Sequence, residues 1–190
     1  MKVGLFFGSF NPVHIGHMAI ANYMLAFTGL EKIWFVVSPH NPLKSKESLL
    51  PDKQRLRMVR EAIGDFAGFR ASDIEFGLPR PSYTIDTLAY LKEKFPNEEF
   101  ALIMGSDNLQ TLHKWKNYET LMNGHDIYVY PRLGSPPAHV AHPRVKITQA
   151  PVMEISSTFI REAIRNKRDV RYFLPEAVWK YIAEMRFYLE

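Results

Sequence analysis

Two histidines near the start of the chain have the type and spacing of groups that bind phosphate. His14 and His17 lie in residues 6–17, FFGSFNPVHIGH, where a short apolar stretch gives way to apolar residues at helical spacing. Side chains three residues apart share one face of a helix. Free N–H groups and the positive dipole end at a helix N-terminus favour an anion, and imidazoles titrate near neutral pH. We therefore expect both rings to donate hydrogen bonds to phosphate oxygens.

Two other interpretations of this pair are less favoured. Two solvated surface histidines at this spacing, directly after a Gly-Ser turn, would be a coincidence. Zinc ligands on one helix usually stand four residues apart with a general-base glutamate between them, whereas Ile15 and Gly16 lie between these histidines.

Two glycines of the same segment fit a turn whose backbone a ligand or another bulky group approaches closely. Gly8 lets the chain turn and exposes its backbone to a ligand. Gly16 falls in the first helical turn, where it costs about 1 kcal/mol relative to alanine. Because the helix gains nothing locally from Gly16, we expect a bulky group to lie close to it.

A second segment, residues 155–161 (ISSTFIR), has the pattern of a capped helix start. Ser156 or Ser157 can cap the helix. Arg161, one turn further on, is always charged and can form paired hydrogen bonds with phosphate oxygens. Taken alone, the segment fits an ordinary serine-capped helix with a solvated arginine better than it fits a phosphate site.

The surrounding elements alternate along the chain. Apolar runs predict strands at residues 2–7, 32–37, 71–76, 100–104, 126–130 and 145–148. Helical spacing predicts helices at residues 15–27, 52–63, 84–95, 156–166 and 176–189, with two short helices in residues 108–121. This order favours an α/β fold with a mostly parallel central sheet and helices on both faces. Such sheets bind ligands at the carboxyl ends of their strands, where most of the chemically interesting segments fall.

Composition narrows the class of protein. The chain has 190 residues, of which 46% are hydrophobic and 23% charged, with a net charge of +4. This length predicts a single domain over residues 1–190. The chain has no cysteine, which excludes disulfides, a thiol nucleophile, an iron–sulfur cluster and a thiolate zinc site. No apolar run reaches the roughly 18 residues of a membrane span, so we expect a cytoplasmic protein without a membrane partner.

The two motifs together resemble the His-x-Gly-His nucleotidyltransferase superfamily, whose members pair that signature with an Ile-Ser-Ser-Thr-x-Ile-Arg segment. Residues 82–88 (SYTIDTL), residues 105–108 (GSDN) followed by Trp115, and residues 172–178 (YFLPEAV) narrow the resemblance. Together they are similar to the bacterial nicotinate-mononucleotide adenylyltransferases over nearly the whole chain. Phe7 departs from the pattern, because many members carry a second glycine there. The resemblance implies a Rossmann-like nucleotidyltransferase fold.

The resemblance also implies roles for individual residues. The catalytic group would be His14, His17, Lys44 and Arg161. ATP would contact Gly8, Ser9, Phe10, His14, His17, Asp107, Ser156, Ser157, Thr158 and Arg161. The mononucleotide would contact Asn11, Lys44, Thr84, Trp115 and Arg132, with the Trp115 indole stacked on the pyridine ring.

Several of these residues also have ordinary structural explanations. Trp115 fits a half-buried core position in an amphipathic helix. Asp107 and Thr84 are natural caps for the helices that follow them, and Lys44 fits a solvated loop. Their assignment therefore depends on the resemblance.

The implied reaction joins ATP to nicotinate mononucleotide, giving deamido-NAD (nicotinate adenine dinucleotide) and pyrophosphate in NAD biosynthesis. A mononucleotide phosphate oxygen would attack in line, without a covalent enzyme intermediate. Mg²⁺ would bind through substrate phosphates, so we expect no dedicated protein metal site. The partners would be these small molecules, with no stable nucleic acid; a homo-oligomer is left open.

Two alternatives stay open at this stage. One is a related transferase with the same ATP half-site but another acceptor, such as phosphopantetheine or nicotinamide mononucleotide. The other is an inactive nucleotide- or RNA-binding module that uses the basic residues of 161–171.

Overall fold

The computed structural model describes residues 1–39, 49–135 and 140–189. Its centre is a sheet of six strands, all parallel, in the order β3-β2-β1-β4-β5-β6. The strands are β1 (Lys2–Gly8), β2 (Lys32–Val37), β3 (Phe69–Ser72), β4 (Glu99–Gly105), β5 (Ile127–Tyr130) and β6 (Val145–Ile147). The predicted α/β class, with a parallel sheet, is confirmed.

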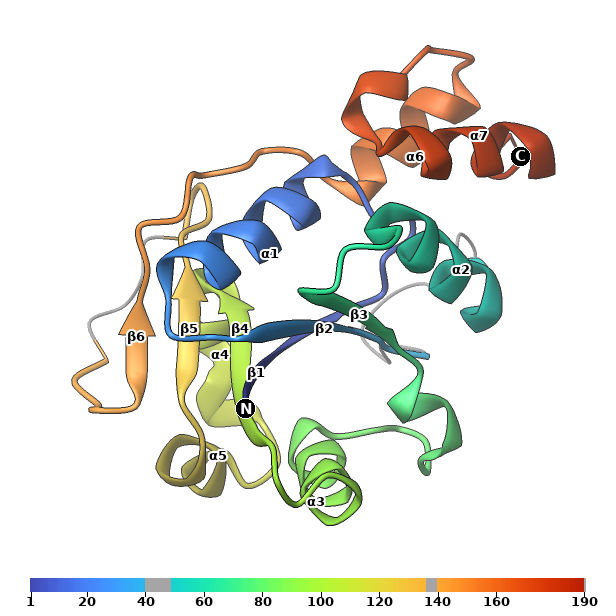
Figure 1. The fold of residues 1–190 in the computed structure, drawn as a ribbon. Helices are drawn as coiled ribbons and strands as arrows, with labels where there is room; N and C mark the ends of the chain where they lie inside the picture. Colours follow the sequence, from blue (N-terminus) through green and yellow to red (C-terminus); the bar gives the residue numbers. More distant parts are fainter. Residues whose placement is uncertain (40–48, 136–139, 190) are drawn as a thin grey trace.

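Helices cover both faces of the sheet, as Figure 1 shows. One face carries α1 (Ile15–Phe27), α2 (Asp52–Ile63), α6 (Ser157–Arg165) and α7 (Glu176–Met185). The other carries α3 (Thr84–Lys94), α4 (Ser106–Thr111), the 3₁₀ turn η2 (Leu112–Lys114) and α5 (Tyr118–Gly124). Alternate residues of each strand point to opposite faces of the sheet and enter two separate hydrophobic cores. Phe6 therefore packs with α1, whereas Leu5 packs with α3.

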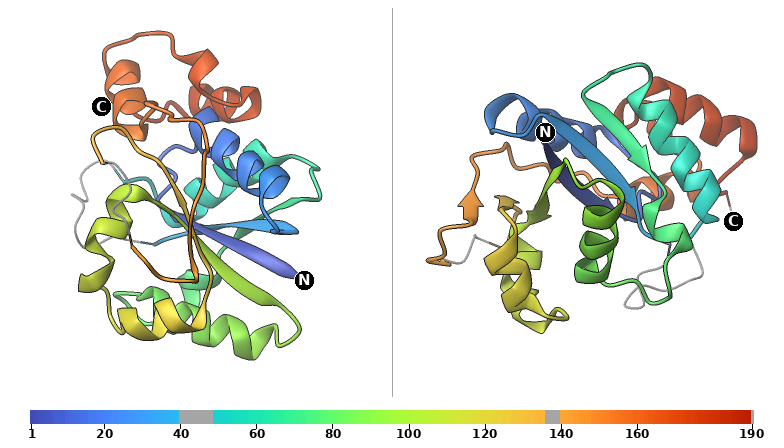
Figure 2. Two further views of the ribbon diagram at one scale, coloured as in Figure 1. Left: turned by 90° about the vertical axis from the view of Figure 1, so that its left-hand side faces the viewer. Right: turned by 60° about the horizontal axis from the view of Figure 1, so that its bottom comes forward.

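The strand order reverses between β1 and β4, which are neighbours in the sheet although β2 and β3 separate them in sequence. A crevice forms at such a switch point, outside the carboxyl ends of the strands. In both views of Figure 2 the carboxyl-terminal helices α6 and α7 lie beside α1 and α2. They therefore bring the end of the chain to the side of the sheet where β1 leads into α1.

Two predicted elements differ from the structure. The strand expected at residues 71–76 ends at Ser72, and a 3₁₀ turn, η1 (Ile74–Gly77), follows. The alternating apolar residues of this stretch do not share one sheet face, because Ile74 packs against the α3 side and Phe76 against the α1 side. The last helix stops at Met185, since Arg186 is left-handed with φ 54°.

Candidate active site

The turn between β1 and α1 folds over the ring of its own Phe10. Phe10 is only 1% exposed and has a left-handed φ of 46°, a conformation that L-residues seldom adopt. A Cβ at Gly8 would lie 2.9 Å from the Phe10 ring, so glycine is needed at that position. Because the Phe10 side chain is core, this turn can offer a ligand only the backbone at Phe10.

The two histidines of the first motif stack at the start of α1. Their ring centroids are 3.7 Å apart and their planes differ by 33°. His14 is the N-cap, and its backbone N–H donates to Nδ1 of His17 over 3.2 Å. Since Nδ1 of His17 accepts this bond, Nε2 carries the proton of the neutral ring.

His14 is buried and uncharged at neutral pH. Burial, and then the charge of Arg132, lower the pKa of His14 to about 4. Its Nδ1 atom is buried without a hydrogen-bond partner among the described residues. This nitrogen faces the first turn of α1, close to Gly16, where a capping box sets the His14 side chain against the His17 backbone N–H.

The bulky neighbour expected at Gly16 is the His14 ring. A Cβ added to Gly16 would lie 3.0 Å from Nδ1 of His14 and 3.1 Å from its Cε1 atom. Glycine at this position therefore lets the two imidazoles stack, at the cost of helix propensity.

The second motif docks on the first. Ser156 caps α6 by accepting the N–H of Phe159 at 3.1 Å. The Ser157 hydroxyl donates to the Pro12 carbonyl at 2.9 Å, and Nη1 of Arg161 donates to the Asn11 carbonyl at 2.9 Å. These bonds bring the first turn of α6, including Thr158, next to the β1–α1 turn.

Asp107 and Arg132 form an ion pair across the ends of β4 and β5. Nη1 of Arg132 lies 3.1 Å from Oδ2 of Asp107, and its backbone N–H donates to the Ser106 hydroxyl at 2.9 Å. A Cβ at Gly105 would collide with both side chains. Oδ1 of Asp107 is buried, without a hydrogen-bond partner in the described part of the chain.

Trp115 lies in a small cleft at the switch point. Phe7, Met104 and Asn108 line the same cleft, at the ends of β1 and β4 and in α4. Trp115 is half-buried, so part of this residue remains accessible in the cleft. The bulky Phe7, which departs from the glycine of the resembled pattern, lines this cleft.

An ion pair brings the α3 segment close to Trp115. Nζ of Lys116 lies 2.8 Å from Oδ2 of Asp86, and it lies 4.9 Å from the centroid of the Tyr83 ring. Thr84, two residues before Asp86, is the first residue of α3, whose N-cap is Tyr83. The N-cap of α4 is Gly105, as that of α3 is Tyr83. Neither Thr84 nor Asp107 is therefore a helix N-cap.

Two predicted residues need separate comment. Lys44 lies outside the described residues. Asn11 is buried, and its Oδ1 atom accepts bonds from the Leu50 N–H at 3.3 Å and the Tyr188 hydroxyl at 2.8 Å. The Asn11 amide oxygen therefore ties three distant segments together, and a contact of Asn11 with the mononucleotide stays a prediction.

Two buried charged residues at this end of the sheet were missed in the sequence. Arg55 is completely buried and donates to several backbone carbonyls, including that of Ser9. Glu75 accepts the Thr87 hydroxyl at 2.8 Å, and burial raises its pKa against hydrogen bonds from Thr87, Ser38 and Ser82. In the sequence, Arg55 resembles the neighbouring Arg57 and Arg60 of the same helix, so only its i, i+3 spacing from Asp52 was a signal.

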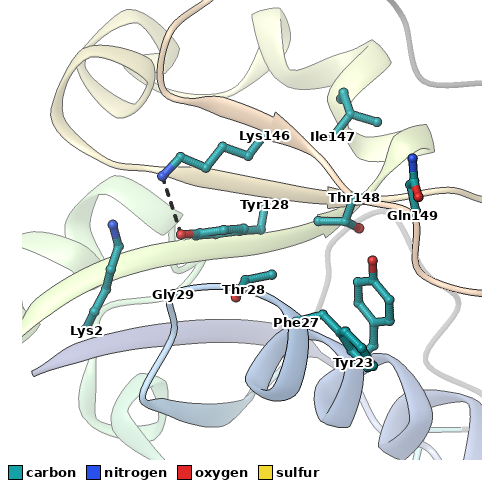
Figure 3. A pocket seen from close by; sticks show the side chains of 10 residues that line it. All are labelled: Lys2, Tyr23, Phe27, Thr28, Gly29, Tyr128, Lys146, Ile147, Thr148 and Gln149. Atoms are coloured by element: carbon teal, nitrogen blue, oxygen red, sulfur yellow. Dashed lines mark hydrogen bonds between the residues drawn. The ribbon is translucent and has the colours of Figure 1, made fainter.

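A second hollow lies away from these residues, beside the end of α1 and over β5 and β6 (Figure 3). Lys2, Tyr23, Phe27, Tyr128 and Lys146 are among its lining residues. None of the described candidate site residues lines it, and the Lys2 and Lys146 ammonium groups are already paired with Asp126.

The donor set of the switch point suits phosphate groups better than a bare metal ion. It consists of imidazoles, hydroxyls, arginines and helix N-termini. Within residues 1–39, 49–135 and 140–189, no three His, Asp or Glu side chains come together as metal ligands. Mg²⁺ fits this site when it arrives on substrate phosphates, since it keeps several waters and needs few protein ligands.

Among the described residues, no helix is long and apolar enough to cross a membrane.

Comparison with known proteins agrees with this geometry. The family model described as cytidylyltransferase-like matches residues 5–163. The chain is 55% identical to the probable nicotinate-nucleotide adenylyltransferase of Flavobacterium johnsoniae, covering 99% of both chains. It is 50% identical to that of Bacteroides fragilis, covering 96% of this chain and 92% of the relative.

Solved structures share the fold. The nicotinic acid mononucleotide adenylyltransferase of Plasmodium falciparum, complexed with NaAD, matches with a TM-score of 0.81 at 19% identity, covering 100% of this chain and 99% of that one. The fold, the site and the family model together define a nucleotidyltransferase with a Rossmann-like sheet. Within that class, the chain belongs to the nicotinate-nucleotide adenylyltransferases of the cytidylyltransferase-like family.

Proposed function

We propose that this enzyme transfers the adenylyl group of ATP to nicotinate mononucleotide, giving deamido-NAD and pyrophosphate. The observation that carries the ATP half of the proposal is the docking of α6 on the β1–α1 turn through Ser157 and Arg161. Two helix N-termini, two imidazoles and a guanidinium thereby converge where a triphosphate would lie. The relatives' printed names support the acceptor.

The reaction needs no protein nucleophile. A phosphate oxygen of the mononucleotide, already ionised at pH 7, attacks the α-phosphorus of ATP. The bond from that phosphorus to the bridging oxygen breaks, and pyrophosphate leaves with the electron pair. The work of the enzyme is to hold the two anions in line and to stabilise charge on the leaving group.

The residues divide this work by their chemistry. Nε2–H of His17 donates to a phosphate oxygen, and the neutral His14 ring stacks beside it and holds His17 through its backbone N–H. Ser156, Ser157, Thr158 and Arg161 hold the triphosphate from the α6 side. Mg²⁺, when bound through the substrate phosphates, would neutralise part of their charge. The Asp107 carboxylate is assigned to the adenosine ribose, as an acceptor.

The acceptor pocket is proposed around Trp115. Its indole stacks on the pyridine ring, and Phe7 lines the same cleft. Thr84, Asn11 and Lys44 belong to the mononucleotide side, and Arg132, paired with Asp107, meets a phosphate between the two halves.

Direct transfer has a stereochemical test. ATP carrying a chiral α-phosphorothioate should give a dinucleotide with inverted configuration at phosphorus, because a single in-line displacement inverts the centre. Labelled pyrophosphate should not exchange into ATP when the mononucleotide is left out. Retention of configuration, or exchange without acceptor, would contradict direct transfer and indicate a covalent intermediate.

A further inference from the structure

Arg55 is a charged side chain sealed inside the protein without contact to solvent. It lies in the first half of α2 and is 0% exposed. Arginine is seldom fully buried unless its charge and its donors are paired. The hydrogen-bond partners of Arg55 therefore show which segments of the chain it holds together.

All five N–H donors of the guanidinium are used. Nε donates to the Leu50 carbonyl at 2.9 Å, and Nη1 donates to the carbonyls of Ser9 at 2.6 Å and Ser38 at 2.9 Å. Nη2 donates to the Pro39 carbonyl at 2.8 Å and to Oδ1 of Asp52 at 2.7 Å. One side chain thus joins the carboxyl ends of β1 and β2 to the start of α2.

Among the acceptor peptide groups whose following residue the structure describes, only that of Ser9 carries an N–H. In a trans peptide the C=O and the following N–H point in opposite directions. Ser38 and Leu50 precede prolines, which have no N–H. The Ser9 carbonyl points at Arg55, so the N–H of Phe10 in the same peptide group points away from it.

We propose that Arg55 is a positioning residue for the ATP half-site, which fixes the Ser9–Phe10 peptide so that its N–H faces the triphosphate. The inference rests on the proposed function, in which this turn contacts ATP through its backbone. Arg161 and Tyr188 also hold the turn, through the main-chain and side-chain oxygens of Asn11. Arg55 itself touches no substrate.

Lysine cannot replace this arrangement. It keeps the charge but has a single ammonium group with three donors, which cannot reach carbonyls on three separate segments. In Arg55→Lys we expect the KM for ATP to rise and kcat to fall by about 10- to 100-fold, as for a misplaced binding loop. The KM for ATP and the binding of an ATP analogue are the readouts, because Arg55 also holds the carbonyls of Pro39 and Leu50, on either side of the segment that contains Lys44.

Met58→Ala is the matched control. Met58 lies in the same helix, is 0% exposed and packs in the α1-side core, so its truncation weakens α2 without touching Ser9. Both variants are compared with wild type by calorimetry with α,β-methylene ATP and by hydrogen exchange of residues 8–14. We expect weaker binding and faster exchange in Arg55→Lys only. A folded Arg55→Lys protein that binds the analogue like wild type, or a Met58→Ala protein with the same loss, would overturn the proposal.

A milder variant covers the case in which Arg55→Lys does not fold. Asp52→Asn removes the acidic partner but leaves the guanidinium and its carbonyl acceptors in place. Because the buried guanidinium then lacks its counter-charge, its bond to the Ser9 carbonyl should loosen and the KM for ATP should rise; an unchanged KM for ATP would overturn the proposal. Analogue binding needs no turnover, so failure of the acceptor assignment would be seen separately, as an active ATP site without pyrophosphate release on nicotinate mononucleotide.

Discussion

The Ser157 hydroxyl donates a hydrogen bond to the Pro12 carbonyl over 2.9 Å, although 145 positions separate the two residues. Pro12 lies in the turn that precedes His14, and Ser157 is the first residue of α6. The bond therefore fixes the start of α6 against the start of α1. Two helix N-termini placed together in this way form one anion site rather than two.

His17 has two functions that substitutions can separate. Its Nδ1 accepts the His14 N–H, while Nε2 is proposed to donate to phosphate. In His17→Asn the amide oxygen can replace the Nδ1 acceptor, but the donor is lost. We expect a melting temperature close to wild type and turnover lower by about 100-fold, the scale for losing one transition-state donor.

His17→Gln provides the complementary control. Its longer amide places an N–H near the Nε2 position and so should retain more turnover than asparagine. Measured kcat values that are equal in His17→Asn and wild type would remove His17 from the catalytic group.

Gly16→Ala tests why glycine stands between the histidines. Alanine gains about 1 kcal/mol of helix propensity, which offsets the cost of moving a buried neighbour, so the variant should be about as stable as wild type. Its Cβ, however, would lie 3.0 Å from Nδ1 of His14 and would displace that ring. The expected result is a fall in kcat without a fall in melting temperature; unchanged kcat would show that the stacked arrangement is not needed.

Burial of neutral His14 makes the stability of the fold depend on pH. The pKa of His14 is about 4 in the folded chain, against an ordinary value of 6.5. Between these values the unfolded state binds more protons, so stability is fully present above pH 6.5 and is lost as the pH falls towards 4. The loss should reach about 2–3 kcal/mol.

Urea unfolding of wild type and His14→Asn over this pH range measures the effect. The difference between the two free energies of unfolding should shrink as the pH falls, and NMR should show a His14 titration near pH 4. In Arg132→Gln this pKa should rise, because a repelling charge is removed. A His14 midpoint near 6.5 would contradict the buried geometry.

Asp126 offers a stability test remote from the site. It lies before β5 at the opposite end of the strands, paired with Lys146 at 2.7 Å and also with Lys2. Figure 3 shows Lys146 reaching the Tyr128 hydroxyl in the same cluster. Burial opposes ionisation of Asp126, but hydrogen bonds from Lys146 and Lys2 outweigh it and lower its pKa to about 2.

The folded pKa lies below the ordinary value of 3.8, so this stabilisation is present above about pH 4 and is lost as the pH falls towards 2. Asp126→Asn should lower the free energy of unfolding at pH 7 by about 1–2 kcal/mol. Neither KM should change. A change in the KM for ATP would mean that this end of the sheet communicates with the site.

Trp115→Ala should act on the acceptor alone. Loss of a stacked aromatic ring weakens binding by roughly 1–3 kcal/mol, or about 5- to 150-fold. The KM for nicotinate mononucleotide should rise by that factor while the KM for ATP stays constant. Steady-state kinetics with each substrate varied in turn measures both, and a constant KM for the mononucleotide would exclude Trp115 from the pocket.

Local pattern was sufficient to predict most of the fold. The apolar runs and helical spacing located α1 and β2 at their observed bounds, because each buries one regular face. Residues 71–76 misled the prediction, since Ile74 and Phe76 alternate like a strand but serve two different cores. The end of α7 depends on Tyr188 turning back to Asn11, a contact across 177 positions that no local pattern records.

The site was predictable only in part, for a similar reason. The histidines and the α6 start carry their chemistry in adjacent residues. Arg55 does not, because its acceptors are backbone carbonyls of four other residues that only the folded chain brings together. The pairing of Asp107 with Arg132 likewise joins the ends of two strands.

The measurement that tests the central claim most directly is pyrophosphate release from ATP and Mg²⁺ with nicotinate mononucleotide, nicotinamide mononucleotide or phosphopantetheine as acceptor, with His17→Asn as the inactive control. The account predicts rapid release with nicotinate mononucleotide, little with the other two, and loss of the signal in His17→Asn. Release that prefers another acceptor would contradict the nicotinate pocket around Trp115. No release with any acceptor, by a protein that still binds the ATP analogue, would contradict adenylyl transfer itself.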